Sequence, residues 1–233
     1  MEITEAGMKK GVASSNTLWT SLLLFSVIFA SFFLPLLPVA LQRNSFRIVY
    51  SVIYISAIFS LERRNNYLIG LFIATVLAGW VSEFFYLPGL STISKSVNVI
   101  FFLVIVISLI RQIAIAKNVT AGVILGSMVG YLLIGLIYST VIAFILHHDP
   151  GAFSNQQITK DVTESGNASV SLYIGFVSLA TLGFGDIVPL KPYTRSLAIW
   201  IAVSGQFYIA IIVALLVGKF SARKKTTDNP GSG

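Results

Sequence analysis

Six consecutive residues have types and spacing suited to binding a cation that has lost part of its water. They are Thr181-Leu182-Gly183-Phe184-Gly185-Asp186, with glycine at two alternate positions. Carbonyls of adjacent residues in an ordinary strand point to opposite sides. To aim them all at one axis, alternate residues must adopt unusual dihedral angles, which glycine adopts at low cost. Carbonyls aligned in this way replace hydration water without adding net negative charge, and the Thr181 hydroxyl adds one more oxygen.

The sequence around this stretch predicts how it is positioned. Residues 170–180 are apolar but too short to cross a membrane, which predicts a short helix that enters the membrane and returns. Non-helical backbone at that depth is tolerated only where protein shields it or where it lines a water-filled path. Long uncharged runs, residues 118–146 and 196–218, lie on either side. We therefore expect the short helix to direct its negative C-terminal end, and the cation-binding loop, towards a central cavity between full spans.

The composition indicates that lipid is the solvent of this chain. Of 233 residues, 55% are hydrophobic and 11% are charged, and the mean hydropathy is +0.85; a soluble domain is about one quarter charged. The net charge of +7 is scattered between apolar runs and forms no basic stripe, which argues against a nucleic-acid partner. With two adjacent histidines, no cysteine and no phosphate-cradling glycine loop, we expect no enzymatic activity and no small-molecule substrate.

The uncharged runs predict an all-α membrane protein with six transmembrane helices. Residues 48–61 are the weakest of these predictions, because they alone reach only about 21 Å. They form either a span extended by flanking charges or an interfacial or re-entrant piece. The six runs are residues 11–42, 48–61, 67–82, 96–110, 118–146 and 196–218.

Flanking charges orient the six predicted spans. With both termini cytoplasmic, more Lys and Arg lie on the inner side than on the outer side, although Arg43 and Arg47 then fall in the first outer loop. Residues 146–167 are polar and predict an exposed loop. The tail from residue 223 to 233 is predicted to be disordered, and its last Gly-Ser-Gly looks like an engineered remnant.

The motif resembles the potassium-channel selectivity filter, usually Thr-Val-Gly-Tyr-Gly-Asp, and Pro189 follows it as in that family. The resemblance covers residues 122–220, and residues 197–218 look like the inner helix of small prokaryotic potassium channels. It implies a potassium-selective channel of a prokaryotic inner membrane that conducts passively, with potassium ions as the permeant ligand and no other cofactor. Since one loop supplies one quarter of a filter, it also implies a homotetramer in a lipid bilayer. The implied potassium ligands are Thr181, Leu182, Gly183 and Phe184, followed by Gly185.

The resemblance assigns roles to further residues. Gly205 matches the gating-hinge glycine of the inner helix, or it is a close-packing contact. Gln206 faces the cavity or bonds to a neighbouring helix. Asp186 and Pro189 support the filter, and Asp186 is held by Tyr173 or by water.

Several positions depart from the family pattern. Phe184 replaces the usual tyrosine and so cannot donate a hydrogen bond to the helix behind it, and Val177 stands where many members have a glutamate. Tyr173 and Ile174 occupy positions often held by tryptophans. We therefore expect a less firmly braced filter that is prone to inactivation.

The N-terminal part predicts a sensor-like domain without gating charges. A voltage sensor carries Arg or Lys at every third position of its fourth span, and residues 96–110 carry none. The expected organisation is a cytoplasmic segment (1–16), a four-helix voltage-sensor-like domain (17–117), a pore domain (118–222) and the tail (223–233), with weak or absent voltage dependence. Two alternatives are a weakly selective cation channel of the same fold, and a transporter or non-conducting membrane subunit.

Overall fold

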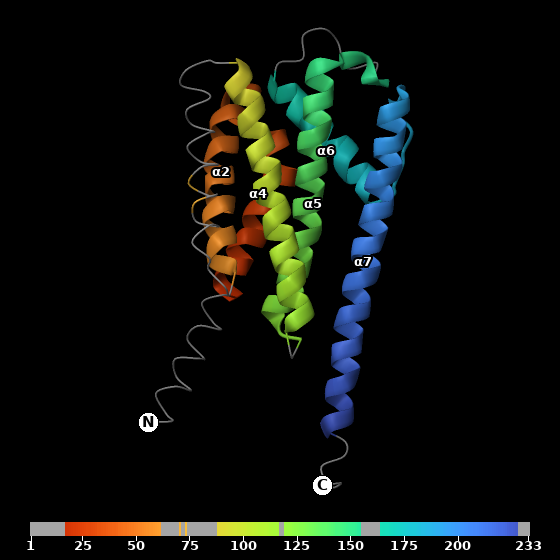
Figure 1. Cartoon of the computed structure of the whole chain (residues 1–233). Coiled ribbons are helices and arrows are strands. Elements are labelled where there is room, and N and C mark those ends of the chain that lie inside the picture. Colours follow the sequence, from red (N-terminus) through yellow and green to blue (C-terminus); the bar gives the residue numbers. More distant parts are fainter. Residues whose placement is uncertain are drawn as a thin grey trace.

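The computed structural model describes residues 17–61, 70, 73, 88–116, 119–154 and 164–227. Within these ranges the regular secondary structure is helical apart from one pair of two-residue strands. Figure 1 shows α2, α4, α5 and α7 running along a common axis, with α6 crossing obliquely between them. The predicted all-α architecture is therefore confirmed for the described part of the chain.

The first helical region ends earlier than the sequence predicts. Residues 17–28 are helical and continue through a π turn, η1 (Phe29–Phe33), and a 3-10 turn, η2 (Leu34–Leu36). Leu37 is extended, with φ −71° and ψ 150°, as expected of a residue that precedes proline. The uncharged run 11–42 is thus not one span, because Pro38 ends it and caps the next helix.

The second helix, α2 (Val39–Ser60), corrects the predicted position of two arginines. Arg43 and Arg47 lie within α2 and not in an outer loop, because the chain breaks at proline and not at the first charged residue. The run 48–61 is the C-terminal part of this helix, and its apolar stretch Ile48–Ser60 is shorter than the candidate spans. The predicted span 67–82 lies almost wholly outside the described residues.

Three long helices complete the bundle: α4 (Pro88–Ile115), α5 (Ala121–His148) and α7 (Pro192–Thr227). The described residues contain four helices long and apolar enough to cross a membrane, namely Thr17–Leu36, Val97–Ile115, Ala121–His148 and Pro192–Ser221. The count of six spans stays a prediction. Because α7 is helical to Thr227, the prediction of disorder from residue 223 is wrong for residues 223–227, whose arginine and two lysines favour helix.

The short helix α6 (Glu164–Leu179) begins earlier than expected. The sequence predicts an exposed loop up to residue 167, but the polar composition there marks contact with water and does not prevent helix formation. The apolar part of α6 is Ala168–Leu179, which agrees with the predicted short helix. Side chains of α6 pack on α5 and α2, through Phe176 and Leu172 in the main core.

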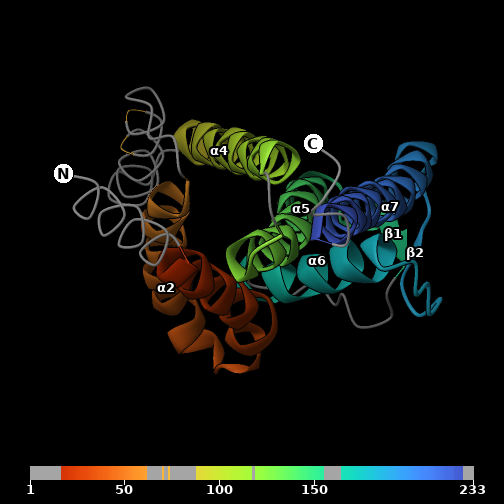
Figure 2. The same ribbon diagram turned by 90° about the horizontal axis from the view of Figure 1, so that it is seen from below.

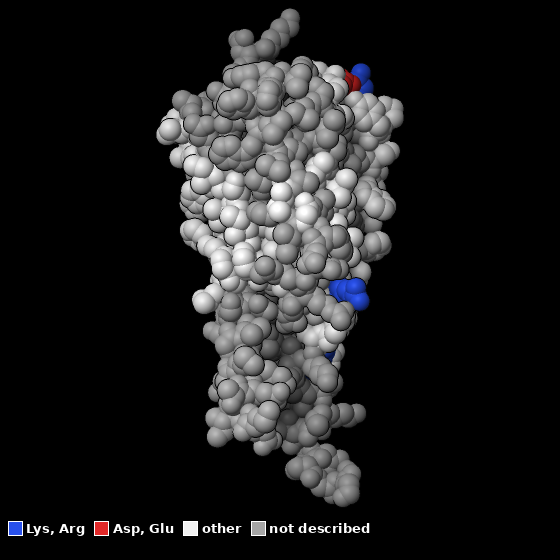
Figure 3. All heavy atoms as spheres, turned by 60° about the vertical axis from the view of Figure 1, so that its left-hand side comes forward, with Lys and Arg blue, Asp and Glu red and all other residues white. Residues whose placement is uncertain are grey.

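The charged side chains that the structure describes lie at the two ends of the bundle. Figure 3 shows the coloured residues of one face gathered near its top and in its lower part, and the described residues drawn between them are white, that is, uncharged. A charge-free band of this kind is what a bilayer requires, since a charge at its centre costs several kcal/mol. The residues are Asp149, Asp186, Lys191 and Arg195 at one end and Arg111 and Lys219 at the other.

Candidate functional site

The motif of residues 181–186 lies in the loop between α6 and α7. The segment that carries it enters the bundle and returns at the same end of the bundle. Figures 1 and 2 show α6 running obliquely towards α7, after which the chain turns back to begin α7 beside the end of α5. A short antiparallel pair closes this hairpin: β1 (Phe153–Ser154), just after α5, pairs with β2 (Val188–Pro189), just before α7. The loop between α6 and β2 is therefore held at both ends.

The loop begins with a helix cap centred on Thr181. The Leu182 amide donates to Val177 O (2.9 Å) and the Thr181 amide donates to Ser178 O (3.0 Å). This pair of bonds is the Schellman arrangement, in which the residue after the C-cap is left-handed and is most often glycine. Thr181 occupies that position with φ 56°. A β-branched residue there is strained, and strain of this kind concentrates at functional sites.

Left-handed backbone recurs at every second residue of the loop. Thr181, Gly183 and Gly185 have φ values of 56°, 54° and 79°. A Cβ added at Gly183 or Gly185 would meet no atom within 4 Å in this chain. The requirement for glycine at these two positions thus comes from the backbone conformation and not from lack of space. The sequence predicts this alternation for the two glycines; the left-handed Thr181 was not foreseen.

The bulky residues of the loop are not covered by their own subunit. Leu182 is 58% exposed and Phe184 is 67% exposed. If the carbonyls of the loop point to one axis, the side chains of Leu182 and Phe184 turn outward, where they are expected to pack against the short helix. Within one chain they do not, so any packing that covers them must come from another molecule or from lipid.

The Thr181 hydroxyl is oriented by two neighbours. It donates to Ala180 O (2.7 Å) and accepts from the Gln206 amide of α7 (3.3 Å). With its proton committed to Ala180, the oxygen keeps a lone pair for a further partner. Gln206 thus bonds to the first residue of the loop and, among the described residues, not to a residue of a neighbouring helix. A position facing a cavity stays a prediction.

Asp186 is bound by Tyr173 at the outer end of the loop. The Tyr173 hydroxyl donates to Asp186 Oδ2 at 2.6 Å, which is one of the two alternatives that the sequence left open. This hydrogen bond holds the pKa of Asp186 below its ordinary value, because it stabilises the charged form. The carboxylate is therefore ionised over the physiological range, at the mouth of the loop.

Gly205 sits where α7 crosses the end of α6. A Cβ at this position would overlap Leu179 O and would lie 2.9 Å from Leu179 Cδ1. Glycine is thus required by a close approach of two helices, one of its two predicted roles. α7 runs through Gly205 as one helix, and its role as a gating hinge stays a prediction.

Other contacts in this region were not signalled by any motif. Tyr138 Oη donates to Ser204 Oγ (2.9 Å), joining α5 to α7 beside Gly205. Thr194, at the start of α7, is fully buried and bonds to Ala152 O at 3.1 Å. The placement of Thr194 two residues after Pro192 is a helix-start pattern, but only the fold shows which carbonyl it reaches.

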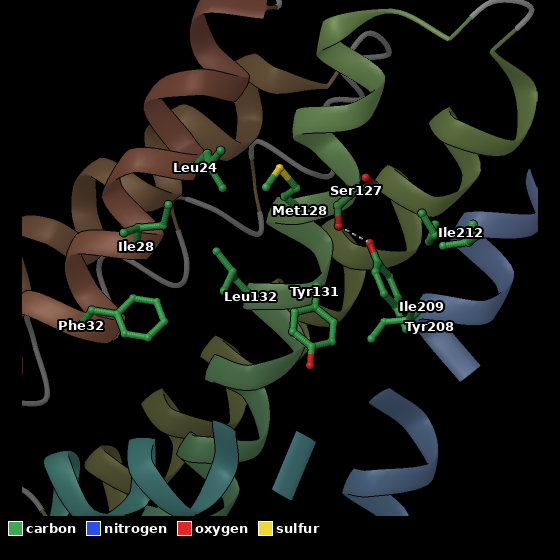
Figure 4. A pocket seen from close by; sticks show the side chains of 11 residues that line it. Leu24, Ile28, Phe32, Ser127, Met128, Tyr131, Leu132, Tyr208, Ile209 and Ile212 are labelled. Atoms are coloured by element: carbon green, nitrogen blue, oxygen red, sulfur yellow. Dashed lines mark hydrogen bonds between the residues drawn. The ribbon is translucent and has the colours of Figure 1, made fainter. Parts of the chain in front are cut away.

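An apolar cavity of about 430 Å³ lies between the first helix, α5 and α7. Figure 4 shows Tyr208 reaching across to α5, where its hydroxyl donates to Ser127 O at 2.7 Å. Gly130 lies directly against that hydroxyl, which confirms the close-packing role expected of glycine at helix contacts. The lining is apolar apart from Ser127 and two tyrosines, so it offers no set of cation ligands like that of the loop.

Comparison with known proteins agrees with this location. Residues 130–222 match the family model described as ion channel. The match covers less than half of the chain and runs from within α5, through α6 and the loop, to the C-terminal part of α7. A search of curated proteins finds no match. The part of the chain that holds the site is therefore similar to an ion-channel family.

Proposed function

We propose that this chain is one subunit of a homotetrameric, potassium-selective channel that conducts passively across a membrane, with residues 181–185 as its filter. The observation that carries the proposal is the left-handed backbone at Thr181, Gly183 and Gly185. It lies in a loop between two helices of membrane-spanning length, inside the segment that matches an ion-channel family. An alternating backbone directs successive carbonyls to one side, where they replace the water around a potassium ion.

Four copies around an axis are required by the mechanism. A single loop offers oxygens from one side only, and a cation that gives up its water must be surrounded. The exposed Leu182 and Phe184 are consistent with a filter whose remaining walls belong to other copies. Ions would pass in file between carbonyl rings, with the Thr181 hydroxyls forming the ring at the inner end.

The end of α6 adds a favourable field for a cation. Its last carbonyls carry the partial negative charge of the helix dipole, and Thr181 and Gln206 lie at this end. In the proposed tetramer the amide oxygen of Gln206 faces the water-filled path below the filter. These groups would hold a potassium ion before it enters the carbonyl rings.

The proposed channel responds weakly or not at all to voltage. The candidate span Val97–Ile115 has its first basic residue at Arg111, close to its end. A gating response needs several charges inside the field, each contributing about 2.3 kcal/mol per 100 mV. We place the channel in a prokaryotic inner membrane with both termini in the cytoplasm.

A weakly selective cation channel of the same fold is the second candidate. Its support is Phe184, which is largely exposed and has no hydroxyl to brace it. A filter that is held less firmly admits sodium more readily.

The reversal potential in planar bilayers separates the two candidates. Purified protein is inserted with potassium chloride on one side and sodium chloride on the other. The proposal expects a reversal potential displaced far from zero, in the direction set by a potassium permeability much larger than the sodium permeability. A reversal potential near zero would favour the weakly selective channel, and the absence of any current from tetrameric protein would count against both.

A further inference from the structure

The residues after the filter are tied to the connection between α5 and α6. We call residues 149–154 the strap and residues 188–191 the outer segment. Within β1 and β2, Phe153 is opposite Pro189 and Ser154 is opposite Val188. The Leu190 amide donates to Ala152 O (2.9 Å), and the Val188 amide to Ser154 Oγ (3.4 Å).

The buried hydroxyl of Thr194 links the strap to the outer segment. Thr194 Oγ1 lies 3.1 Å from Ala152 O and 2.9 Å from Lys191 O, and it accepts from the Lys191 amide at 3.2 Å. Thr194 and Ala152 are both 0% exposed. A hydroxyl has one proton, so Thr194 donates to one of the two carbonyls at a time. The bond to Ala152 O holds the strap, and the bond to Lys191 O holds the outer segment. Buried from water, such a bond is costly to leave unmade.

A second link fixes the strap at its start. Tyr193 Oη donates to Asp149 Oδ2 (2.7 Å), while Asp149 Oδ1 accepts from the Gly151 amide (3.1 Å). Arg195 Nε also donates to Pro189 O (3.3 Å). The first residues of α7 therefore hold the strap and the outer segment together.

The filter itself has few such supports inside its own chain. Leu182 and Phe184 are mostly exposed. The side-chain hydrogen bond to Asp186 comes from Tyr173, and its other bonds come from the adjacent backbone amides of Asp186 and Ile187. Phe184 cannot donate a hydrogen bond. The position of the outer end of the filter is thus determined mainly by the segment that follows it, and that segment is held by the strap.

We propose that Thr194 is a positioning residue for selective conduction: by locking the strap onto the outer segment, it sets the outer end of the filter. This inference rests on the proposed function. Loosening the lock would let the outer filter leave its conducting geometry, so potassium current would decay faster and the preference for potassium over sodium would fall. A tighter link between the strap and the outer segment would slow the decay of potassium current.

The test compares Thr194→Val with Thr194→Ser in planar bilayers. Valine has nearly the shape of threonine but lacks the hydroxyl, whereas serine keeps it. We expect Thr194→Val to speed the decay of potassium current, or to lower the potassium-to-sodium permeability ratio, by about two- to tenfold, the range of one hydrogen bond. Thr194→Ser should stay close to the unmodified channel.

A cysteine pair tests the opposite direction and does not depend on the folding of Thr194→Val. The chain has no cysteine, and Ser154 and Val188 are directly paired, within reach of a disulfide. In the variant Ser154→Cys/Val188→Cys, oxidised protein should lose current more slowly than the same protein after reduction.

The outcomes separate the strap from the filter. Selective conduction with unchanged decay and permeability ratio in Thr194→Val, and no difference between oxidised and reduced cysteine pairs, would overturn the role of Thr194 and leave the proposed function intact. If Thr194→Val fails to assemble, the comparison of current decay between oxidised and reduced cysteine-pair protein decides alone, and equal decay would overturn the proposed role of the strap. An unmodified channel without potassium selectivity would overturn both proposals.

Discussion

Thr181 combines a strained backbone with a useful side chain. Its left-handed conformation costs a β-branched residue about 1–2 kcal/mol relative to glycine, and the capping geometry would accept glycine. The hydroxyl is what glycine would lose, since it bonds to Ala180 O and to Gln206. The presence of threonine at this strained position therefore indicates a role for the hydroxyl oxygen.

Replacing Thr181 separates stability from conduction. We expect Thr181→Gly to leave the free energy of unfolding unchanged or to raise it by up to about 1 kcal/mol, as measured by thermal unfolding in detergent. We also expect this substitution to reduce potassium selectivity. Thr181→Ser keeps the hydroxyl and should conduct selectively. A glycine variant that conducts as the unmodified protein does would show that the hydroxyl has no role in permeation.

The bond between Tyr173 and Asp186 predicts a pH dependence. Because the pKa of Asp186 is lowered in the folded protein, the bond contributes stability that is fully present above the ordinary carboxyl value of about 3.9 and is lost as the pH falls through the lowered value. Tyr173→Phe should therefore lower the unfolding temperature at pH 7, and the difference should shrink below about pH 4.

Tyr138→Phe is the matched control for that prediction. The Tyr138 hydroxyl donates to Ser204, a neutral partner. Its removal should therefore lower the unfolding temperature by the same amount at pH 7 and at low pH. If the Tyr173→Phe difference persisted unchanged at low pH, the carboxylate would not be the group that the tyrosine stabilises.

At the scale of elements, the crossing of α6 and α7 depends on the absence of a side chain at Gly205. A methyl group there meets the backbone of Leu179, which cannot move as a flexible side chain could. We expect Gly205→Ala to destabilise the protein by about 1–3 kcal/mol, as overpacking does. Thermal unfolding in detergent measures this.

Gly218 supplies the control on the same helix. A Cβ there meets nothing within 4 Å, so Gly218→Ala should be neutral or should stabilise α7 by up to about 1 kcal/mol. Equal effects of the two substitutions would show that helix propensity, and not the close approach to Leu179, decides the cost at Gly205.

Lys219 joins the far end of α7 to α4. Its ammonium donates to Ile113 O (2.6 Å), Ala114 O (2.8 Å) and Ala116 O, which are carbonyls at the C-terminal end of α4 where a cation is favoured. We expect Lys219→Met to destabilise the protein by about 1–2 kcal/mol and to increase amide exchange at the end of α4. Arg111→Met, at an exposed position of α4, should have little effect; exchange unchanged by the lysine substitution would refute the capping role.

The sequence predicts the elements that periodicity and apolar length determine. It anticipates α5, α7, the short helix and the glycine alternation at Gly183 and Gly185, since each depends on a local pattern. Uncharged runs measure apolar length and not helix ends, so they misplace the break at Pro38 and the start of α7 at Pro192. The contacts of Gly205, Thr194 and Lys219 join segments far apart in the chain, and no local pattern signals them.

At the scale of the whole molecule, one chain leaves much of the segment that matches the ion-channel family uncovered. Ile199, Trp200 and Phe207 of α7 are each about two-thirds exposed, as is Phe184. Lipid covers part of such a surface, and a filter needs copies on its other sides. We expect cross-linking of the purified protein to stop at four subunits, and a monomer that conducts potassium would exclude the proposed assembly.

The central claim is that the alternating backbone of residues 181–185 selects potassium, and ion flux into liposomes tests it most directly. Purified protein is reconstituted, and potassium influx is compared with sodium influx for the unmodified chain and for Gly183→Ala. Since φ at Gly183 is 54° and a Cβ there meets nothing in its own chain, this substitution strains the filter backbone without crowding the rest of the subunit. The account predicts potassium flux well above sodium flux, abolished by Gly183→Ala. Equal flux of the two ions, or selective flux that survives the substitution, would contradict it.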